Sequence, residues 1–324
     1  MSKERYKSFD ELTGVVAEYR KRHIPLDNIV QDWQYWGEDM GLWNSMNFDT
    51  VRFARPKEVI DRLHREYHVK LTVSVWPGVG KKTAIYQAMD SAGVLFDVPT
   101  WAGYKVVDIY DSEAQKIFWN YLKDGLYSKG VDSWWMDATE PSFRDGLYRS
   151  KQEYWAKSAG MTAIGPFSRY LNTYSLMLSR MMYDRLRQQS DKRVSILARS
   201  AFAGQQRYGT STWSGDIYAS WDVFAKQIPA GLNLCMTGFP YWTTDIGGFR
   251  VISQEKGGKQ GAGEIGDFRG DEGNPDGGGY KKGLRDSAYL ELYTRWFQFG
   301  AFCPMFRAHG TEVPREIWHF GEPG

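Results

Sequence analysis

Apolar and polar positions along the chain follow two alternating patterns, one with the period of a helix and one typical of short buried strands. Helical spacing of apolar residues predicts helices over residues 8–23, 56–67, 112–129, 167–188, 221–234 and 284–299. Short apolar or β-branched runs predict strands over residues 26–36, 69–75, 131–136, 193–198, 209–213, 238–243 and 302–306. Because strands and helices take turns along the chain, we predict parallel strands joined by helical crossovers.

Local signals support several of these boundaries. Ser8 followed by Glu11 is a capping-box pattern at the start of the first helix, and Pro56 suits the first position of the second. Gly130 is expected just past the end of the third helix. Pro229 is expected to kink the fifth.

Polar or aromatic side chains recur at the points where the predicted strands end. The seven exits carry Asp32, Trp76, Asp137, Arg199, Asp216, Asp245 and Arg307. A (β/α)8 barrel assembles its site from the carboxyl ends of many strands, whereas an open doubly wound sheet has its site at one switch point. No glycine-rich nucleotide motif or phosphate loop supports the open sheet. We therefore predict an α/β fold of the (β/α)8 TIM-barrel type.

The predicted elements stop short of a complete barrel, which would require one strand before Ser8 and one helix after Gly324. We therefore expect residues 1–324 to form a (β/α)8 domain that lacks its first strand and last helix, excised from a longer multidomain chain. Exposed sheet edges are expected beside the first and last strands unless another segment covers them. Residues 261–283, rich in glycine and charge, are expected to form a long surface loop.

Charge and composition exclude several functions. The net charge is +2 with no basic block, so the electrostatic footprint of a nucleic-acid binder is missing. No apolar run reaches the roughly 18 residues of a transmembrane helix, so no membrane association is expected. The polar start of the chain does not resemble a signal peptide. The compartment is left open, and a periplasmic or secreted location is compatible with a longer chain.

Metal and disulfide chemistry find little support in the sequence. Cys235 and Cys303 lie in apolar contexts and are expected to be small buried thiols rather than disulfide partners or metal ligands. Among the five histidines, His64 and His68 have i, i+4 spacing, but on a charged surface helix that makes a poor zinc site. No metal and no other cofactor is therefore expected.

Aromatic residues are unusually abundant and point to a sugar ligand. They make up 16% of the chain and include 14 Trp, many of them beside Asp, Gly or Asn, as in residues 32–36 and 241–245. Pockets that combine flat aromatic faces with carboxylates suit sugars, which have apolar C–H faces and a rim of hydroxyl groups.

Several carboxylates without a metal or phosphate loop fit glycoside hydrolysis, which needs one carboxylate as nucleophile or base and one carboxylic acid. Asp137 ends the buried strand 131–136 and would face Arg199 on the next strand, which favours its ionised form. Asp216 follows Trp213 and a Ser-Gly turn, where partial desolvation would raise its pKa as an acid catalyst requires. The alternative interpretation at both positions is capping of the segment that follows.

Further polar residues at the strand exits could contact a sugar. Asp32 and Asp245 suit bidentate hydrogen bonds to sugar hydroxyls, although each could instead cap the glycine-containing turn that follows it. Arg307 and His309 could hydrogen-bond the sugar and orient a carboxylate, while a lone histidine is often structural.

Four motifs, in order along the chain, resemble glycoside hydrolase family 31: WWMDATEP at 134–141, WSGD at 213–216, DIGGF at 245–249 and RAHG at 307–310. The resemblance implies a retaining α-glycosidase on a TIM barrel, with Asp137 as nucleophile and Asp216 as acid/base. It also implies a subsite for the cleaved sugar that contains Asp32, Trp76, Arg199, Trp213, Asp245, Phe249, Arg307 and His309. Trp134 is added to this predicted set, and Glu140 is expected to support Asp137.

Within the family, residues 32–36 and 74–77 resemble the α-xylosidase branch. The resemblance implies an oligosaccharide substrate and β-sandwich domains that flank the barrel in a full-length chain. The predicted function is a retaining, exo-acting α-xylosidase that acts on xyloglucan-type α-xylosyl oligosaccharides through a covalent glycosyl-aspartate. Open alternatives are an α-glucosidase or α-transglucosylase of the same family and, from other classes, a non-catalytic carbohydrate-binding module or a metal-assisted hydrolase.

Overall fold

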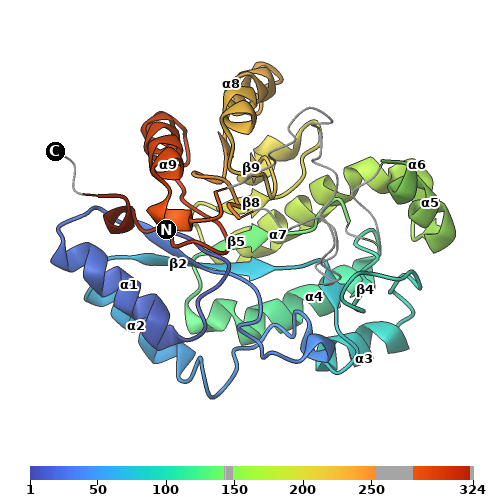
Figure 1. Ribbon diagram of the computed structural model, residues 1–324. Coiled ribbons are helices and arrows are strands. Elements are labelled where there is room, and N and C mark those ends of the chain that lie inside the picture. The colour runs from blue at the N-terminus through green and yellow to red at the C-terminus, as the bar shows by residue number, and fades with distance from the viewer. Residues whose placement is uncertain (142, 144–148, 253–279, 322–324) are drawn as a thin grey trace.

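Residues 1–141, 143, 149–252 and 280–321 are described by the computed structural model of the chain (Figure 1). At their centre lies a six-stranded sheet in which each neighbouring pair of strands is parallel. In order across the sheet, the strands are β1 (Asn28–Gln31), β2 (Lys70–Val75), β5 (Ser133–Met136), β8 (Ile196–Ala198), β9 (Thr210–Trp213) and β10 (Trp242–Thr243). The order across the sheet is the order along the chain, as the predicted barrel requires.

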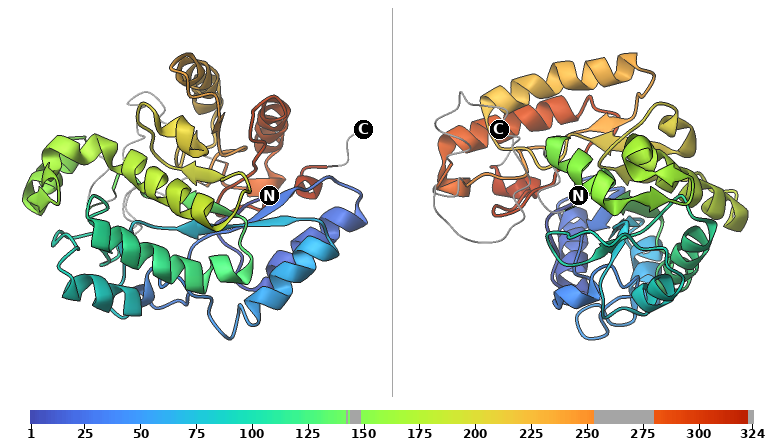
Figure 2. Two further views of the ribbon diagram at one scale, coloured as in Figure 1. Left: turned by 180° about the vertical axis from the view of Figure 1, so that it is seen from behind. Right: turned by 90° about the vertical axis from the view of Figure 1, so that its right-hand side faces the viewer.

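Helices cover the outer side of this sheet, as the two views of Figure 2 show. The longer ones are α1 (Phe9–Lys21), α2 (Pro56–Arg65), α4 (Ser112–Gly125), α7 (Tyr174–Gln189), α8 (Trp221–Met236) and α9 (Ser287–Gly300). Within the described part of the chain, no helix has both the length and the apolar character needed to cross a membrane.

Several smaller elements in the loops were not predicted from apolar periodicity. They are the helices α3 (Ala84–Ser91) and α5 (Arg149–Ala159), and the antiparallel pairs β3 (Gly78–Val79) with β4 (Lys105–Val106) and β6 (Met161–Thr162) with β7 (Gly165–Pro166). The short helix α6 (Phe167–Tyr170) lies within the helix predicted over residues 167–188. Short 3₁₀ turns lie at Met40–Leu42, Tyr127–Lys129, Leu171–Thr173, Gln205–Tyr208, Gly283–Arg285 and Ile317–His319. The strands and 3₁₀ turns among these elements span too few residues to establish a period. Most of the surface loop predicted over residues 261–283 lies outside the described residues.

Helix boundaries follow the predicted local signals. The Ser8 hydroxyl accepts a hydrogen bond from the Glu11 N–H at 3.2 Å, which confirms the N-cap. The Glu11 carboxylate accepts from the Lys7 N–H at 2.6 Å, one residue away from the partner that a full capping box would use. Gly130 ends the 3₁₀ turn after α4 with a φ of 104°, as expected of a glycine in that position. Pro229 lies inside α8.

The single helix predicted over residues 167–188 is interrupted. α6 ends at Tyr170 and α7 begins at Tyr174, with a 3₁₀ turn between them. The Tyr170 carbonyl accepts from the Tyr110 hydroxyl at 2.6 Å and from the Thr173 hydroxyl at 2.8 Å. Side-chain donors that bind a helical carbonyl compete with the regular backbone ladder. The interruption therefore arises from contacts that apolar periodicity does not report.

The strand predicted over residues 302–306 is wrong, because this stretch forms turns. Backbone N–H groups at its start donate three residues back into the end of α9. Strand-like pairing comes later in the chain, at a parallel bridge between Ile246 and Ala308.

Neither cysteine is fully buried, contrary to the prediction. Cys235 is exposed near the end of α8, and Cys303 is half-buried just beyond α9. The same end of α8 leaves the large apolar side chains of Leu232 and Met236 exposed. The apolar neighbours that suggested burial therefore lie on the surface of the described structure.

Two segments that are not regular strands, residues 1–4 and 307–310, cover the sheet edges that were predicted to be exposed. The Met1 carbonyl accepts from the Val30 N–H of β1 at 3.0 Å, and the N–H groups of Ser2 and Glu4 each donate at 3.1 Å to carbonyls within residues 308–310. The bridge at Ala308 joins this second segment to the residues after β10. The first segment thus takes the place of a first strand, and the ring of backbone hydrogen bonds closes.

Side chains inside this ring form a small apolar cluster that is separate from the main core. It consists of Val30, Trp135, Leu197 and Trp213, from β1, β5, β8 and β9. The main core lies between the sheet and its helices. Successive residues of a strand point to opposite faces, so the residue two positions after a cluster member also points to the inner face. Asp32, Asp137 and Arg199 each follow a cluster member by two positions.

Candidate active site

A buried cluster of three carboxylates and one guanidinium lies beyond the ends of β5, β8 and β9. Arg199 Nη1 is 3.0 Å from Asp137 Oδ1 and 3.9 Å from Asp216 Oδ2. Its Nη2 donates to Glu140 Oε1 at 2.5 Å. None of these side chains is more than 15% exposed. Among the residues that the structure describes, no group of three or more His, Cys, Asp or Glu side chains is arranged to hold a metal ion.

Strand register places Asp137 and Arg199 side by side. Met136 of β5 pairs with Ala198 of β8, so the next residue of each strand faces the same interior. The Asp137 N–H donates to the Val75 carbonyl at 3.0 Å, and the Arg199 N–H donates to the Met136 carbonyl at 3.2 Å. Asp137 is therefore placed by the pairing of the sheet. Its role is not to cap a helix directly after β5, because the described residues 138–141 form turns and begin no helix.

Asp216 lies on a loop that is bonded to the loop after β10. The Ile217 carbonyl accepts from the Phe249 N–H at 2.8 Å. The N-cap of α8 is Ser220, whose hydroxyl accepts from the Val223 N–H at 3.1 Å. The alternative that Asp216 caps this helix is therefore wrong.

The separation of the two carboxylates is limited by their shared partner. Asp137 Oδ1 and Asp216 Oδ2 lie 3.0 and 3.9 Å from the same Arg199 nitrogen, so they are no more than about 6.9 Å apart, the sum of those distances. Retaining glycosidases hold their two carboxyl groups about 5–5.5 Å apart, and inverting ones about 6.5–9.5 Å. The limit applies to one oxygen of each carboxylate, and the retaining range lies within it.

Burial governs the protonation of this pair. Burial raises the pKa of Asp137 to about 7, against the opposing effect of Arg199, and it raises the pKa of Asp216 to about 7 as well. Arg199 favours the ionised form of Asp137, as expected, but desolvation outweighs this one ion pair. The guanidinium lies nearer to Asp137, so a proton shared by the pair at neutral pH resides mainly on Asp216.

Asp245 and Arg307 form a second buried ion pair, from Arg307 Nη2 to Asp245 Oδ1. The Arg307 guanidinium lies 5.0 Å from the ring centre of Trp135 and 5.8 Å from that of Trp213. Burial raises the pKa of Asp245 to about 6. Within the described structure, Asp245 Oδ2 and Arg307 Nη1 are buried without a hydrogen-bond partner. Buried polar atoms are seldom left unpaired, so these two are candidates to bind a ligand.

His309 lies between Asp32 and Ser2, a serine that was not predicted from the sequence. Its Nε2 is 4.0 Å from Asp32 Oδ2, and its Nδ1 is 2.7 Å from Ser2 Oγ. Phe249 stacks on the ring with centres 5.5 Å apart, and Trp135 contacts it edge-on at 4.6 Å. Burial raises the pKa of Asp32 and lowers that of His309. The predicted residues Asp32, Phe249 and His309 are thus brought together.

Trp135, rather than Trp134, belongs to the inner face of the barrel. Trp134 packs in the main core and is one position out of phase with Trp135. Trp135 contacts Trp213 edge-on, with ring centres 5.4 Å apart. The prediction that Trp134 binds substrate is therefore wrong.

Trp76 follows β2 and is anchored by Asn44, which the sequence analysis did not single out. The Asn44 side chain donates to the Trp76 carbonyl at 2.6 Å and accepts from its N–H at 3.2 Å. The Trp76 ring centre lies 5.9 Å from the Arg199 guanidinium, and the ring packs edge-on against Trp43 at 4.8 Å. Trp76 therefore places an aromatic face beside the carboxylate cluster.

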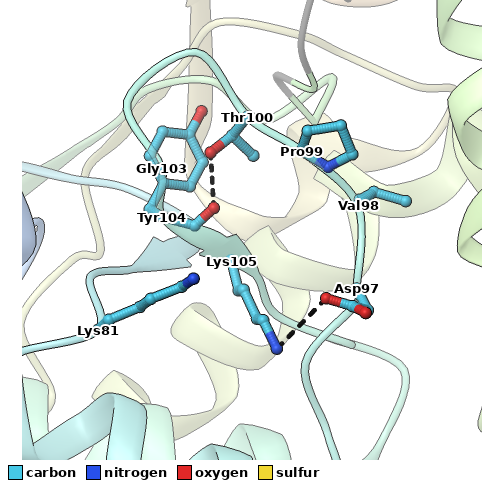
Figure 3. Close-up of a pocket in the computed structure, with 8 residues that line it drawn as sticks. All are labelled: Lys81, Asp97, Val98, Pro99, Thr100, Gly103, Tyr104 and Lys105. Carbon is cyan, nitrogen blue, oxygen red and sulfur yellow. Dashed lines mark hydrogen bonds and ion pairs between the residues drawn. The ribbon is translucent and has the colours of Figure 1, made fainter.

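A separate cavity of about 380 Å³ lies beside Tyr104 (Figure 3). Its lining residues are Lys81, Asp97, Val98, Pro99, Thr100, Gly103, Tyr104 and Lys105. The Lys105 ammonium lies 3.4 Å from Asp97 Oδ1, and the Tyr104 ring stacks on Trp43 at 5.2 Å. No predicted site residue lines this cavity, so it is distinct from the carboxylate cluster.

Residues 1–323 match the family model for the glycosyl hydrolases family 31 TIM-barrel domain. An alpha-xylosidase from Saccharolobus solfataricus is 41% identical to this chain, over 98% of this chain and 38% of its own length. An uncharacterized family 31 glucosidase from Pseudescherichia vulneris is 31% identical, over 97% of this chain and 52% of its own length.

Solved structures give the same result. A family 31 alpha-xylosidase from Xanthomonas citri has a TM-score of 0.84 and 39% identity, covering 100% of this chain and 33% of that one. A family 31 alpha-xylosidase from a soil metagenome, complexed with xylose, has a TM-score of 0.80 and 30% identity, covering 99% of this chain and 45% of that one. This chain thus spans about a third to a half of the length of these relatives. The match over nearly all of its residues shows that the chain belongs to glycoside hydrolase family 31.

Proposed function

We propose that this chain is the catalytic barrel of a retaining α-glycosidase whose substrate is an α-xylosyl oligosaccharide of the xyloglucan type. The observation that carries the proposal is the single Arg199 guanidinium in contact with both Asp137 and Asp216. It brings one oxygen of each carboxylate within about 6.9 Å of the other, which is compatible with double displacement. The alpha-xylosidases among the relatives support xylose as the sugar that is cleaved.

In the first step, Asp137 carries the negative charge and attacks the anomeric carbon. The bond between that carbon and the glycosidic oxygen breaks as the Asp216 carboxylic acid gives its proton to the departing oxygen. The product is an ester between the sugar and Asp137, with the anomeric configuration inverted to β. The position of Arg199 nearer to Asp137 supports this division of roles.

In the second step, the roles of acid and base are exchanged. Once Asp137 is an uncharged ester, it no longer repels the Asp216 carboxylate, so the pKa of Asp216 falls and it becomes a base. Asp216 takes a proton from water, the water oxygen attacks the anomeric carbon, and Asp137 departs as a carboxylate. Two inversions release the sugar with its original α configuration.

The other predicted residues would surround the sugar in this proposal. Asp245 Oδ2 and Arg307 Nη1 offer one acceptor and one donor to its hydroxyl groups. Trp76 and Trp213 supply apolar faces, and Glu140 holds the second nitrogen of the arginine. The remaining members of the proposed subsite are Asp32, Trp135, Phe249 and His309.

Hydrolysis of p-nitrophenyl α-xyloside tests the proposal, with p-nitrophenyl α-glucoside as the rival substrate. We expect the wild type to release p-nitrophenol from the xyloside with the higher kcat/KM. Asp137→Ala should lower kcat by about 10⁴-fold or more, because it removes the nucleophile. Asp124→Ala, which changes an exposed carboxylate on α4, is the matched control and should leave kcat unchanged.

Asp216→Ala should slow a natural oligosaccharide by about 10²–10⁴-fold and the nitrophenyl substrate far less, because a good leaving group needs no proton. NMR of fresh product should detect the α anomer first. Preference for the glucoside would make the protein an α-glucosidase. Oligosaccharide binding by the wild type without turnover would make it a carbohydrate-binding module, and initial release of the β anomer would refute double displacement.

A further inference from the structure

Ser2 contacts the proposed sugar subsite through His309 and has no part in the mechanism described above. It has 0% exposure, and its Oγ lies 2.7 Å from His309 Nδ1. The Ser2 N–H donates to the Ala308 carbonyl at 3.1 Å, which holds the two backbones side by side. Main-chain pairing therefore delivers the hydroxyl to the imidazole.

The remaining surroundings of the His309 ring are mostly aromatic. Phe249 covers one face, with an angle of 22° between the rings, and Trp135 meets the ring edge-on. The polar contacts of the ring lie at its two nitrogens, with Ser2 at Nδ1 and Asp32 on the side of Nε2. Among the described residues, Ser2 is the hydrogen-bond partner of this imidazole.

A neutral imidazole has one N–H and one lone pair, so its two nitrogens play different roles. Burial, followed by the charge of Arg307, lowers the pKa of His309 and keeps the ring neutral. The 4.0 Å between its Nε2 and Asp32 Oδ2 is too long for a direct hydrogen bond, but one sugar hydroxyl could bind both groups. A sugar hydroxyl binds most strongly between Nε2 and Asp32 if Nε2 is always a hydrogen-bond donor or always an acceptor.

We propose that Ser2 is a positioning residue that holds His309 in one ring orientation and one tautomer, so that Nε2 and Asp32 bind a sugar hydroxyl together. The inference rests on the proposed function, which supplies the sugar. Ser2 itself touches no substrate and acts through His309. Without its hydroxyl, Nδ1 has no partner in an apolar surrounding, and the ring is free to change tautomer or to flip.

The test uses two Ser2 variants of similar shape, assayed on p-nitrophenyl α-xyloside. Ser2→Thr keeps the hydroxyl, and Ser2→Val replaces it with a methyl group. We expect Ser2→Val to raise KM about five- to tenfold and to change kcat less than about twofold, because the sugar hydroxyl is bound in both the ground and transition states. Ser2→Thr should stay near the wild type.

A double-mutant cycle with His309→Ala shows whether Ser2 acts through the imidazole. In that background the Thr and Val variants of Ser2 should behave alike, because the partner is gone. A difference that persists without His309 would overturn the proposal. Equal losses in Ser2→Thr and Ser2→Val with His309 present would also overturn it, since they would assign the effect to packing.

Nitrogen-15 NMR of the His309 ring separates failure of this proposal from failure of the proposed function, because it requires no turnover. We expect one tautomer in the wild type and in Ser2→Thr, and a shifted Nδ1 resonance in Ser2→Val. This result would support Ser2 as the positioning residue even for a protein that hydrolyses no glycoside. Identical Nδ1 resonances in the two variants would refute the proposal whatever the activity.

Discussion

Removal of the Arg199 cation is expected to move the pH profile of the proposed α-glycosidase activity, and not only to lower the rate. Arg199→Met keeps a long, apolar stem and removes the charge. In the wild type, burial already raises the pKa of Asp137 to about 7, although Arg199 Nη1 lies 3.0 Å from its carboxylate. The substitution removes the interaction that opposes this rise, so the pKa of Asp137 rises further.

The size of the effect follows from the geometry of the ion pair. An opposite charge at this distance lowers a carboxyl pKa by about 1–3 units. Because about half of Asp137 is ionised at pH 7 in the wild type, loss of the Arg199 charge reduces the ionised fraction by roughly 5- to 500-fold, and kcat/KM should fall by a similar factor. Removal of one partner from a buried ion pair also costs about 3–5 kcal/mol of stability. Protonation of Asp137 offsets part of this cost.

The assay is kcat/KM for p-nitrophenyl α-xyloside, measured from pH 5 to pH 9 for each variant. The acidic limb of the profile should move to higher pH in Arg199→Met, and the deficit relative to the wild type should shrink as the pH rises. Arg199→Lys keeps the charge without the fork and should show a smaller displacement. Arg180→Met is the matched control, because Arg180 is 56% exposed on α7 and pairs loosely with Asp184 at 3.6 Å.

An equal loss at every pH would refute this reasoning. It would show that Arg199 does not set the ionisation of Asp137 and that its contribution is the placement of side chains. A thermal melt of Arg199→Met at each pH distinguishes that result from loss of the folded state.

Asp216→Asn is expected to stabilise the protein at pH 8 but not at pH 4, by on the order of 1–4 kcal/mol, as measured by urea unfolding. The sign follows because burial raises the pKa of Asp216 from 3.8 to about 7. Between these two pH values the folded state binds a proton that the unfolded state has released, so the folded state loses stability as the pH rises from 3.8 to about 7. An equal gain in stability at pH 4 and pH 8 would contradict this explanation. Gly248→Ala should cost about 3 kcal/mol, because its φ of 76° strains alanine and the added Cβ would lie 2.5 Å from the backbone of Ala219. Gly204→Ala, with a φ of 90° and open space around it, should cost about 1 kcal/mol, and similar costs at both glycines would exclude a role for the contact.

The barrel could be predicted because its strands and helices leave strong and different patterns in the sequence. Each predicted strand from 26–36 to 238–243 contains an observed strand. The site at the strand exits was predictable for a related reason: the side-chain period of a strand is two, so Asp137 must share the face of Trp135. The prediction over residues 302–306 was wrong because an apolar run alone does not distinguish a strand from turns that pack against a helix end.

Other parts of the site left no local signal in the sequence. Trp134 and Trp135 are adjacent in a strand that is buried on both faces, so composition does not reveal which of them points inward. Asn44 and Ser2 act on partners that are 32 and 307 residues away. The raised pKa of Asp137 could not be predicted either, because desolvation depends on the whole assembled site.

The two proposed catalytic carboxylates depend on different parts of the fold for their placement. Asp137 is held by the backbone pairing of β5 with β2 and β8. Asp216 lies on a loop that is hydrogen-bonded to the segment of Gly248 and Phe249. That segment is held by Arg315. The fully buried Arg315 guanidinium donates to the carbonyls of Gly248 and Phe249 at 2.7 and 3.3 Å.

This arrangement separates covalent attack from proton transfer in structural terms. A substitution that disturbs strand register displaces Asp137, so it should abolish turnover of every substrate. A substitution that loosens the loop around Gly248 displaces Asp216, so it should affect most the substrates whose leaving group needs a proton. Residues after β10 therefore bear on the proposed acid/base step although they lie far from Asp216 in the sequence, because the loop that carries it is bonded to theirs.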